Sequence, residues 1–388
     1  MTELHISGKT AHRSANRSIR HRSGRCEQQD PGLIPRNWVV VETLIGAERS
    51  STVLDGTEPR EFSKLTRASV AGNRKVASYL DPLVRECATS GQPRRTKVEL
   101  PDGCVKNLVA VPTLGPSGQV HAAAIWVGNP DDDLPDIPNV GAIEWSPSGI
   151  VTTTPAAQYL LQLPLGEVLS GHTIPELLSG FDHWGDRGRF LSMFDLVDPA
   201  DQWIGAATTT YEDGTDHQLC IAARASGPRP SRTIRAIVFE VALDDSTIPV
   251  DPCALVFRQM PIPAGHALAL ADLYSGFVHE WLAKERTPLA GWRHHQPEFD
   301  YDSQLLAANT CIAMATGARR TAKTPARLRF SPAGEWISLD ATWTRIKGRG
   351  RPQALIDITP IAPTPIPFIE DCEVCQDLAH RTRSQVDS

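Results

Sequence analysis

The sequence has no long hydrophobic run and only a small excess of charge. No apolar stretch in the 388 residues approaches the roughly 20 residues that a membrane-spanning helix needs. The formal net charge is −6, whereas proteins that bind nucleic acid usually present a basic face. Hydrophobic residues still make up 41% of the chain, which is enough to build buried cores. We therefore expect a globular protein with no nucleic acid and no membrane among its partners.

The short motifs that carry common catalytic chemistry are also missing. The chain has no G-x-S-x-G nucleophile elbow, no P-loop and no G-x-G-x-x-G after a strand. The glycines of "IKGRGRP" (346–352) predict a basic hairpin loop, which is not a phosphate-binding loop. No stretch of adequate length remains for a kinase, cyclase or phosphodiesterase module. We therefore predict no catalytic residues and no enzymatic activity.

Cysteine is sparse and scattered, and no export signal accompanies it. The eight cysteines lack the spacing of a disulfide framework, so reduced thiols in the cytoplasm explain them better. The basic segment 12–25 is not followed by an apolar segment, as a signal peptide would require. We expect residues 1–35 to form a disordered basic leader and the protein to be cytoplasmic. A contact of this leader with an acidic surface or with nucleic acid is the alternative.

The sequence does contain a repeated turn. Gly103, Gly214 and Gly334 each lie in a D-G or P-x-G turn that can join two antiparallel strands. A strong strand follows each turn after about 22 residues, and successive turns are separated by the length of a domain. This period is too long for a solenoid repeat, so it predicts three domains in series. The three strands are 120–128, 234–242 and 353–361.

Strands and helices precede the first two of these units. Segments 37–46 and 50–56 predict short strands, and apolar residues at three- and four-residue steps predict a helix over 73–91. In the second unit, 141–154 predicts a hairpin closed by Ser-Pro-Ser-Gly, and capping-box spacing predicts a helix that begins at Thr173. The pattern is thus strands, then helix, then three further strands.

The sequence of the third unit predicts more helical residues than the sequences of the other two units. Segment 253–262 predicts its opening strand. We expect a long amphipathic helix over 266–285, because its large apolar residues fall on one side. A second helix over 302–317 ends at Gly317.

Two Pro-containing polar segments, 128–139 and 244–252, predict linkers between the units. The sequence therefore predicts an α+β fold of three consecutive domains, each an antiparallel sheet of about five strands with helices on one face. Ligand-sensing GAF and PAS domains are built in this way. The predicted parts are a leader (1–35), a GAF-like domain (36–130), two PAS-like domains (138–245 and 252–364) and a flexible tail with a Cys-x-x-Cys pair (365–388).

Three segments resemble a known family. "NWVVVETLIGAERSSTVLDG" (37–56), "GAIEWSPSGIV" (141–151) and "GEWISLDATWTRI" (334–346) are similar to a small group of actinobacterial, chiefly mycobacterial, three-domain proteins. The resemblance covers roughly residues 36–364. It implies a GAF-like domain followed by two PAS-like domains and a role in signal transduction. It supplies no catalytic residues for this chain.

Two groups of residues have the composition of a metal site. Cys372 and Cys375 form the only Cys-x-x-Cys pair, which can bind a metal shared with a partner, act in redox chemistry, or do neither. His294, His295 and Glu298 lie together in sequence. Adjacent histidines point to opposite sides of an extended chain, however, so a polar loop between two helices is the competing interpretation.

Aromatic residues gather in the middle unit. Those at its helical flank and on its inner strands are candidates to line a small-molecule pocket, although core packing alone also explains them. No haem or flavin motif is present, so we predict no cofactor and leave the ligand unknown. The pocket candidates are Trp145, Phe190, Phe194 and Trp203, with Phe181 and Trp184 nearby. In the adjoining loop, Arg187 and Arg189 could bind an anion or pair with aspartates, although a solvated loop is the competing interpretation.

These observations favour a non-enzymatic sensory, signal-transduction or scaffold protein that binds a small molecule or a protein. Its expected partners are a protein of a signalling pathway and, as a possible homodimer, a second copy of the chain. Two alternatives stay open. One is a metal-assisted hydrolase with a site near His294, His295 and Glu298, and the other is a purely structural interaction protein.

Overall fold

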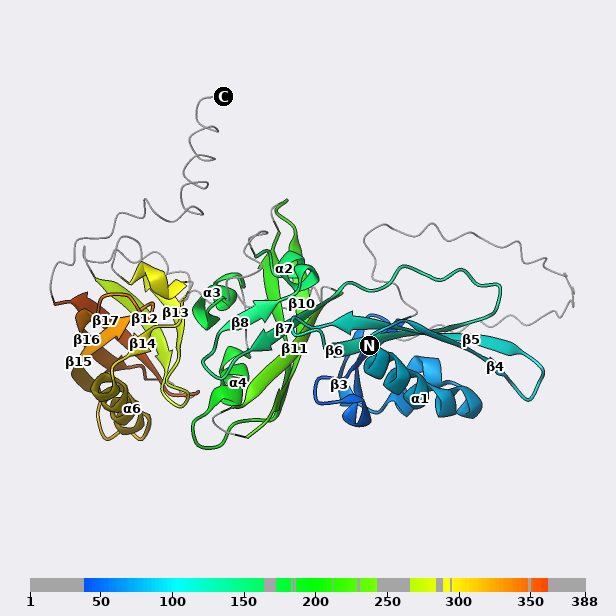
Figure 1. Cartoon of the computed structure of the whole chain (residues 1–388), viewed down its shortest axis with the longest axis horizontal. Helices are drawn as coiled ribbons and strands as arrows, with labels where there is room; N and C mark the ends of the chain where they lie inside the picture. The colour runs from blue at the N-terminus through cyan, green and yellow to red at the C-terminus, as the bar shows by residue number, and fades with distance from the viewer. Residues whose placement is uncertain are drawn as a thin grey trace, which may run out of the picture. The chain divides into compact units, whose positions relative to one another are not determined.

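Three antiparallel sheets follow one another along the chain, separated in the sequence by the two predicted linkers (Figure 1). The computed structural model describes residues 38–163, 172–182, 184, 186–211, 213–228, 231–242, 266–283, 289–293, 295–347 and 350–361. The predicted leader, the opening strand at 253–262 and the tail lie outside these residues. The predicted α+β class with three antiparallel sheets is confirmed.

The N-terminal sheet has the strand order β3-β2-β1-β6-β5-β4. Helix α1 (Arg74–Ser90) packs its buried residues against one face of this sheet. The Asn73 side chain accepts a hydrogen bond from the Lys75 amide at its start, and Gly91 ends it at φ +63°. The strands are β1 (Trp38–Glu42), β2 (Ser51–Asp55), β3 (Glu58–Ser63), β4 (Arg94–Glu99), β5 (Val105–Leu114) and β6 (Val120–Gly128), with short 3₁₀ turns at Ala47–Arg49, Leu65–Arg67 and Ser69–Ala71.

The middle sheet has the order β8-β7-β11-β10-β9. Several short helices cover one face, and their apolar residues join those of the strands in one core. The strands are β7 (Val140–Trp145), β8 (Val151–Thr153), β9 (Gln202–Thr210), β10 (Asp216–Ser226) and β11 (Thr233–Val241). The helices are α2 (Pro155–Leu160), α3 (Ile174–Ser179), α4 (Arg187–Leu191) and the 3₁₀ turn η4 (Ser192–Phe194).

The C-terminal sheet has the order β13-β12-β17-β16-β15-β14. Helix α6 (Tyr301–Ala315) begins at Asp300, whose side chain accepts a hydrogen bond from the Ser303 amide, and it packs against β15. The strands are β12 (Ala267–Asp272), β13 (Val278–Ala283), β14 (Glu298–Phe299), β15 (Thr321–Arg329), β16 (Ile337–Arg345) and β17 (Gln353–Pro360), with the 3₁₀ turn η5 at Ala290–Arg293. No described helix has the length and apolar character to cross a membrane.

The predicted turns join antiparallel strands in all three sheets. Gly103 lies between β4 and β5, Gly214 between β9 and β10, and Gly334 between β15 and β16. Gly103 and Gly214 have φ angles of +81° and +82°, a conformation that favours glycine. The repeat seen in the sequence is therefore a repeat of hairpins.

The predicted helix over 266–285 is wrong, because this segment is the hairpin β12–β13. Every residue from Ala267 to Asp272 is buried, since β12 lies between two strands and is covered on both faces. Such a strand is apolar throughout and loses the alternation that identifies a half-exposed strand. The apolar residues that suggested a helical face belong partly to the turn, where Gly276 has φ +76°.

A second apolar core joins the N-terminal and middle sheets on the faces away from their helices. It contains Val40, Leu44, Val53, Leu54, Ala122, Val140, Cys220, Ala222, Ile237, Phe239 and Val241. Each of these two sheets is thus covered on both faces, by helices on one and by the other sheet on the second.

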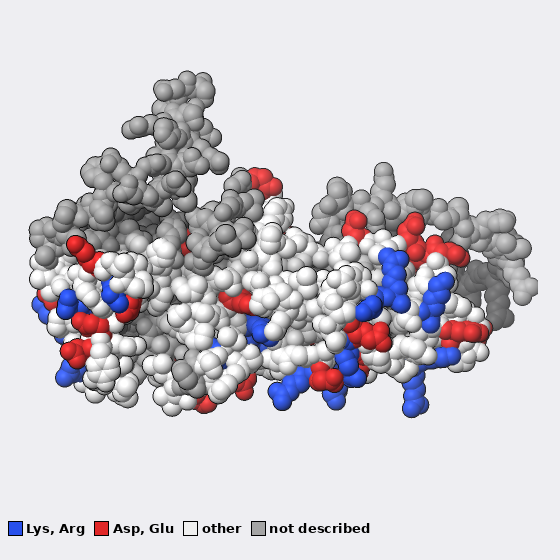
Figure 2. All heavy atoms as spheres, viewed as in Figure 1, with Lys and Arg blue, Asp and Glu red and all other residues white. Residues whose placement is uncertain are grey.

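On the surface of the N-terminal unit, charges of both signs are interspersed over α1 and the strands beside it (Figure 2).

Two pairs of polar side chains lie beside this second core. Arg224 of β10 donates to Glu42 of β1 at 2.9 Å, and the Glu42 side chain has no exposed surface. His121 of β6 is fully buried between Glu144, 2.9 Å from its Nε2, and the Ala236 carbonyl, 3.3 Å from its Nδ1. Burial alone would raise the pKa of Glu144, but hydrogen bonds from His121 and Ser117 outweigh it and lower the pKa to about 2.

The Glu144 pair should make stability depend on pH. A carboxyl group whose pKa is lowered in the folded state stabilises that state above its unfolded pKa of about 4.3, and the contribution is lost as the pH falls towards 2. Glu144→Gln should therefore lower the free energy of unfolding at pH 7 by about 1–3 kcal/mol, and the difference from the unaltered protein should shrink below pH 4. Denaturant unfolding at several pH values measures this. Exposed Glu99→Gln is the control, and equal pH profiles for the two variants would contradict the prediction.

Candidate functional site

Six aromatic rings form one cluster in the middle unit, here called the aromatic cluster. Phe190 of α4 is fully buried at its centre, with ring centroids of four neighbours at 5.0–5.5 Å. These separations are those of directly packed aromatic side chains. The cluster comprises Trp145 at the end of β7, Phe181 and Trp184 between α3 and α4, Phe190, Phe194 of η4 and Trp203 of β9.

All four predicted pocket residues lie in the aromatic cluster. Trp145, Phe190 and Trp203 are buried, and Phe194 is partly buried. The fold brings them together because β7 and β9 lie at different positions in one sheet while α4 and η4 cover its face. That they line a ligand pocket stays a prediction.

Three indole N–H groups of the cluster have no hydrogen-bond acceptor. The Nε1 atoms of Trp145, Trp184 and Trp203 are buried and unpaired among the described residues, as are those of Trp38 and Trp281 elsewhere. Trp343, by contrast, donates to Thr324 at 2.8 Å. A buried donor without a partner costs about 1–3 kcal/mol. Three such unpaired donors in one apolar cluster therefore lower the stability of the folded state. A hydrogen-bond acceptor on a bound molecule would offset this loss.

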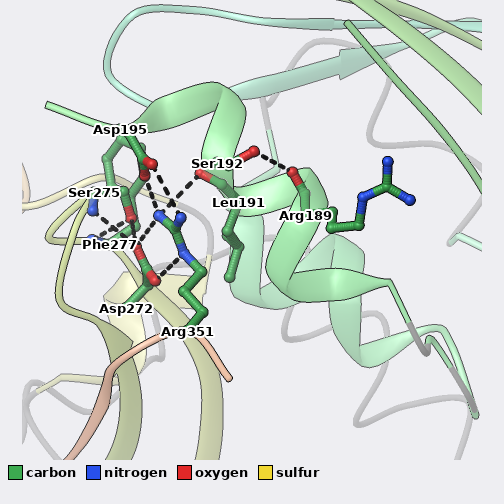
Figure 3. A network of polar contacts seen from close by, with 8 residues as sticks. All are labelled: Arg189, Leu191, Ser192, Asp195, Asp272, Ser275, Phe277 and Arg351. Atoms are coloured by element: carbon green, nitrogen blue, oxygen red, sulfur yellow. Dashed lines mark hydrogen bonds and ion pairs between the residues drawn. The ribbon is translucent and has the colours of Figure 1, made fainter. Parts of the chain in front are cut away.

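A polar network lies next to the aromatic cluster and connects the middle unit to the C-terminal sheet (Figure 3). Arg351, in the predicted basic hairpin loop between β16 and β17, donates to Asp195 just after η4 and to Asp272 at the end of β12. Two of these contacts measure 3.0 Å to Asp195 Oδ2 and 2.7 Å to Asp272 Oδ2. The Asp272 side chain is fully buried and also accepts from the Ser275 amide at 2.7 Å. We call Arg351, Asp195 and Asp272 the junction triad.

The guanidinium of Arg351 is held in its charged form. Burial alone would lower the pKa of Arg351, but hydrogen bonds from its guanidinium to Asp195 and Asp272 outweigh this and raise it. The guanidinium also lies 5.2 Å from the centroid of the Tyr274 ring and donates to the Leu191 carbonyl at 3.4 Å. One arginine therefore contacts the helical layer of the middle unit and the first strand of the C-terminal sheet at once.

Further contacts support the same junction. Arg187 of α4 donates to Glu280 of β13 at 2.7 Å, and the ring centroids of Phe194 and Phe277 are 5.4 Å apart. His279 of β13 is fully buried with neither ring nitrogen paired among the described residues. Burial, followed by the charges of Arg187 and Arg351, holds the pKa of His279 well below its usual value, so the imidazole is neutral. Arg189 is largely exposed and forms an ion pair with Asp186 at 3.5 Å, which is the pairing with an aspartate considered for this loop.

A cavity of about 360 Å³ opens beside the junction triad. Arg351, Tyr274 and Arg345 line it, together with Gly188 of α4. Arg345 donates to the carbonyl of Ala315 at the end of α6, at 3.3 Å. This site was not predicted from the sequence, although the basic hairpin loop that supplies Arg351 was.

Of the predicted metal-site residues, the structure describes His295 and Glu298, so the two predicted sites stay predictions. Glu298 accepts two hydrogen bonds from Arg329, at 2.8 and 2.9 Å, and these hydrogen bonds lower the pKa of Glu298. His295 is exposed, and His294, Cys372 and Cys375 lie outside the described residues. Within the described ranges, no three His, Cys, Asp or Glu side chains are placed to hold a metal ion.

The fold is that of a solved structure. The chain superimposes on an uncharacterised protein from Mycobacterium tuberculosis with a TM-score of 0.64 and 19% identity, over 84% of this chain and 97% of that one, which shows the fold alone. A sensory box histidine kinase/response regulator from Burkholderia thailandensis (TM-score 0.21, 13% identity, 26% of this chain and 77% of that one) and an RNA-binding light-oxygen-voltage receptor (TM-score 0.22, 10% identity, 57% and 95%) match too distantly to support an argument.

The sequence comparisons find one family model that is similar to the N-terminal part of the chain. No curated protein matches the sequence. The family model described as "Rv3651-like, N-terminal" matches residues 37–136, which comprise the whole N-terminal sheet, helix α1 and part of the first linker. The resemblance to a mycobacterial family is thus confirmed, and the family model matches the N-terminal part of the chain.

Proposed function

We propose that the chain is a non-enzymatic sensory protein of three GAF/PAS-like domains that binds a small molecule at the aromatic cluster. The observation that carries the proposal is the set of three buried indole N–H groups without acceptors in this cluster. Antiparallel sheets with helices on one face support it, since ligand-sensing PAS and GAF domains are built in this way, and in some of them the space between helices and sheet holds the ligand.

The lining of the cluster defines the chemistry of the ligand. Its side chains offer aromatic surface and N–H donors, so the complementary molecule is flat and apolar and carries carbonyl or ether oxygens as acceptors. The rings are in direct contact with one another, so such a molecule can enter only if they separate. Binding would therefore change the conformation of α4 and η4, which carry Phe190 and Phe194.

The same short segment provides a route for the signal. Phe194 belongs to the cluster and contacts Phe277 of the C-terminal hairpin, and the next residue, Asp195, belongs to the junction triad. A ligand that favours one position of η4 would then favour one arrangement of the junction. A sensor of this kind transmits its state through another chain, so we expect a signalling protein as partner. We also propose that the protein is cytoplasmic. A purely structural interaction protein is the alternative, and dense packing of the rings favours it.

Coumarin and naphthalene can test the ligand class, because the two are of similar size and shape and only coumarin carries acceptor oxygens. We expect coumarin to quench tryptophan fluorescence and to bind about 2- to 10-fold more tightly than naphthalene, the value of one net hydrogen bond. Trp203→Phe should reduce this ratio, whereas Trp343→Phe, whose indole is already paired, should leave it unchanged. Equal affinities would contradict the proposed role of the indole N–H donors. No binding of either compound, together with no copurified molecule in native mass spectrometry, would favour the structural alternative.

Arg351→Met tests the route of the signal. The variant leaves the buried carboxylate of Asp272 without its cation, so the free energy of unfolding should fall by about 3–5 kcal/mol. Adding Asp272→Asn should recover part of this loss. In the unaltered protein, we expect coumarin to change hydrogen exchange in β13. Coumarin should still bind to the double variant, but hydrogen exchange in β13 should no longer respond.

The matched control is Arg345→Met, in the same cavity but without a carboxylate partner among the described residues. It should change stability by less than about 1 kcal/mol and keep the response of β13. If β13 still responds to coumarin in the Arg351→Met/Asp272→Asn variant, the signal takes another route.

A further inference from the structure

The outward face of α6 carries an apolar row. Large side chains on it are unusually exposed: Tyr301 is 77% exposed, Leu305 50% and Ile312 59%. The opposite face holds the buried residues Ser303, Thr310, Cys311 and Met314, which pack towards the sheet. The row, here called the α6 seam, consists of Tyr301, Leu305, Ala308, Ile312 and Ala315.

The spacing of the α6 seam is that of a coiled coil. Its members are separated by four, three, four and three residues, the alternation of the a and d positions of a heptad. Single exposed apolar residues are normal on a protein surface, but a continuous row marks a surface that another molecule covers. The seam is about 21 Å long, from a rise of 1.5 Å per residue.

Unpaired charges of opposite sign lie at the two ends of the helix. Asp302 is exposed in the first turn, and Arg319 and Arg320 are exposed just after the last turn. None of these three side chains forms an ion pair with another described residue. The distribution is acidic at one end and basic at the other, so it complements a copy of itself that runs in the opposite direction.

We propose that the α6 seam binds the α6 seam of a second copy of this chain, with the two helices antiparallel about a two-fold axis at Ala308. Tyr301 then lies beside the partner's Ala315, and Leu305 lies beside the partner's Ile312. The alanines at the centre let the helices approach closely. Asp302 reaches the basic end of the partner helix, and the two helix dipoles oppose each other favourably.

The proposal does not rest on the ligand site, because no residue of the aromatic cluster belongs to the seam. A four-turn seam is smaller than a specific, stable protein–protein interface, which buries at least about 1,200 Å². The dimer should therefore be weak, with a dissociation constant on the order of micromolar. It would bring two C-terminal sheets together without involving either the N-terminal or the middle sheet.

Sedimentation velocity of the full chain from about 1 to 100 μM tests the interface. We expect concentration-dependent dimerisation that Leu305→Glu or Ile312→Glu weakens at least 10-fold. Val197→Glu is the matched control, since Val197 is 94% exposed outside the seam and this variant should dimerise normally. All these positions are exposed, so circular dichroism should show an unchanged fold. A monomer throughout the range, or a dimer that neither seam variant weakens, would overturn the proposal.

Charge reversal tests the orientation. Asp302→Arg alone, or Arg319→Glu with Arg320→Glu, should weaken the dimer, and all three changes in one chain should restore it. Restoration requires that the two helix ends meet across the interface, which happens only in the antiparallel arrangement. If the three changes together weaken the dimer as much as each set alone, this orientation is excluded.

Disulfide trapping provides an independent measurement. In a background with Cys104 and the four cysteines outside the described residues replaced by Ser, Ala308→Cys should cross-link to itself. Tyr301→Cys should not cross-link to itself but should cross-link to Ala315→Cys when the two variants are mixed. Self-cross-linking of Tyr301→Cys would show a parallel pair and would overturn the proposed geometry.

Discussion

An antiparallel sheet of this chain has two faces, and a layer of helices covers only one of them. The N-terminal and middle sheets meet this constraint by packing their second faces together in a shared apolar core. This explains why β6, with its run of alanines, is buried along almost its whole length. The polar groups at the edge of that core, such as Glu42 and Arg224, are paired because water cannot reach them. The N-terminal and middle sheets thus depend on their contact with each other to bury their second faces.

The contact between the middle and C-terminal units has a different chemical character. There the middle unit contributes short helices, and the contact depends on the junction triad and on a neutral buried histidine. Buried ion pairs often contribute little net stability, but they penalise any arrangement that separates the charges. A junction of this kind favours a few discrete arrangements of the two units over a continuous range of arrangements. Such behaviour suits a protein in which one unit reports its state to the next.

Much of the fold could be predicted from local signals. Turn glycines such as Gly103 and the three- and four-residue apolar spacing over 73–91 act within a few residues, and the structure confirms the hairpin and the helix that they predict. The hairpin β12–β13 was missed because burial on both faces removes alternation, and a continuous apolar run is then compatible with a helix. The aromatic cluster was found by composition alone, since its members are the large rings of one unit.

The junction triad could not have been found in the same way. Asp195, Asp272 and Arg351 are separated by dozens of residues, and each is an ordinary polar residue in its local sequence. The four-and-three spacing of the α6 seam is visible in the sequence, but its exposure follows only from the packing of α6. Local patterns therefore identify elements, whereas sites made by distant segments require the fold.

Four of the six outer strands in the described sheets have one more consequence. β3 and β4 are rich in charge and β3 contains Pro59, while β8 and β14 are only three and two residues long. Proline, charge and brevity each make a strand a poor template for further pairing. A chain with several exposed strand edges would otherwise be prone to polymerise by pairing edge strands of different copies. The character of these four edge strands disfavours such fibre growth.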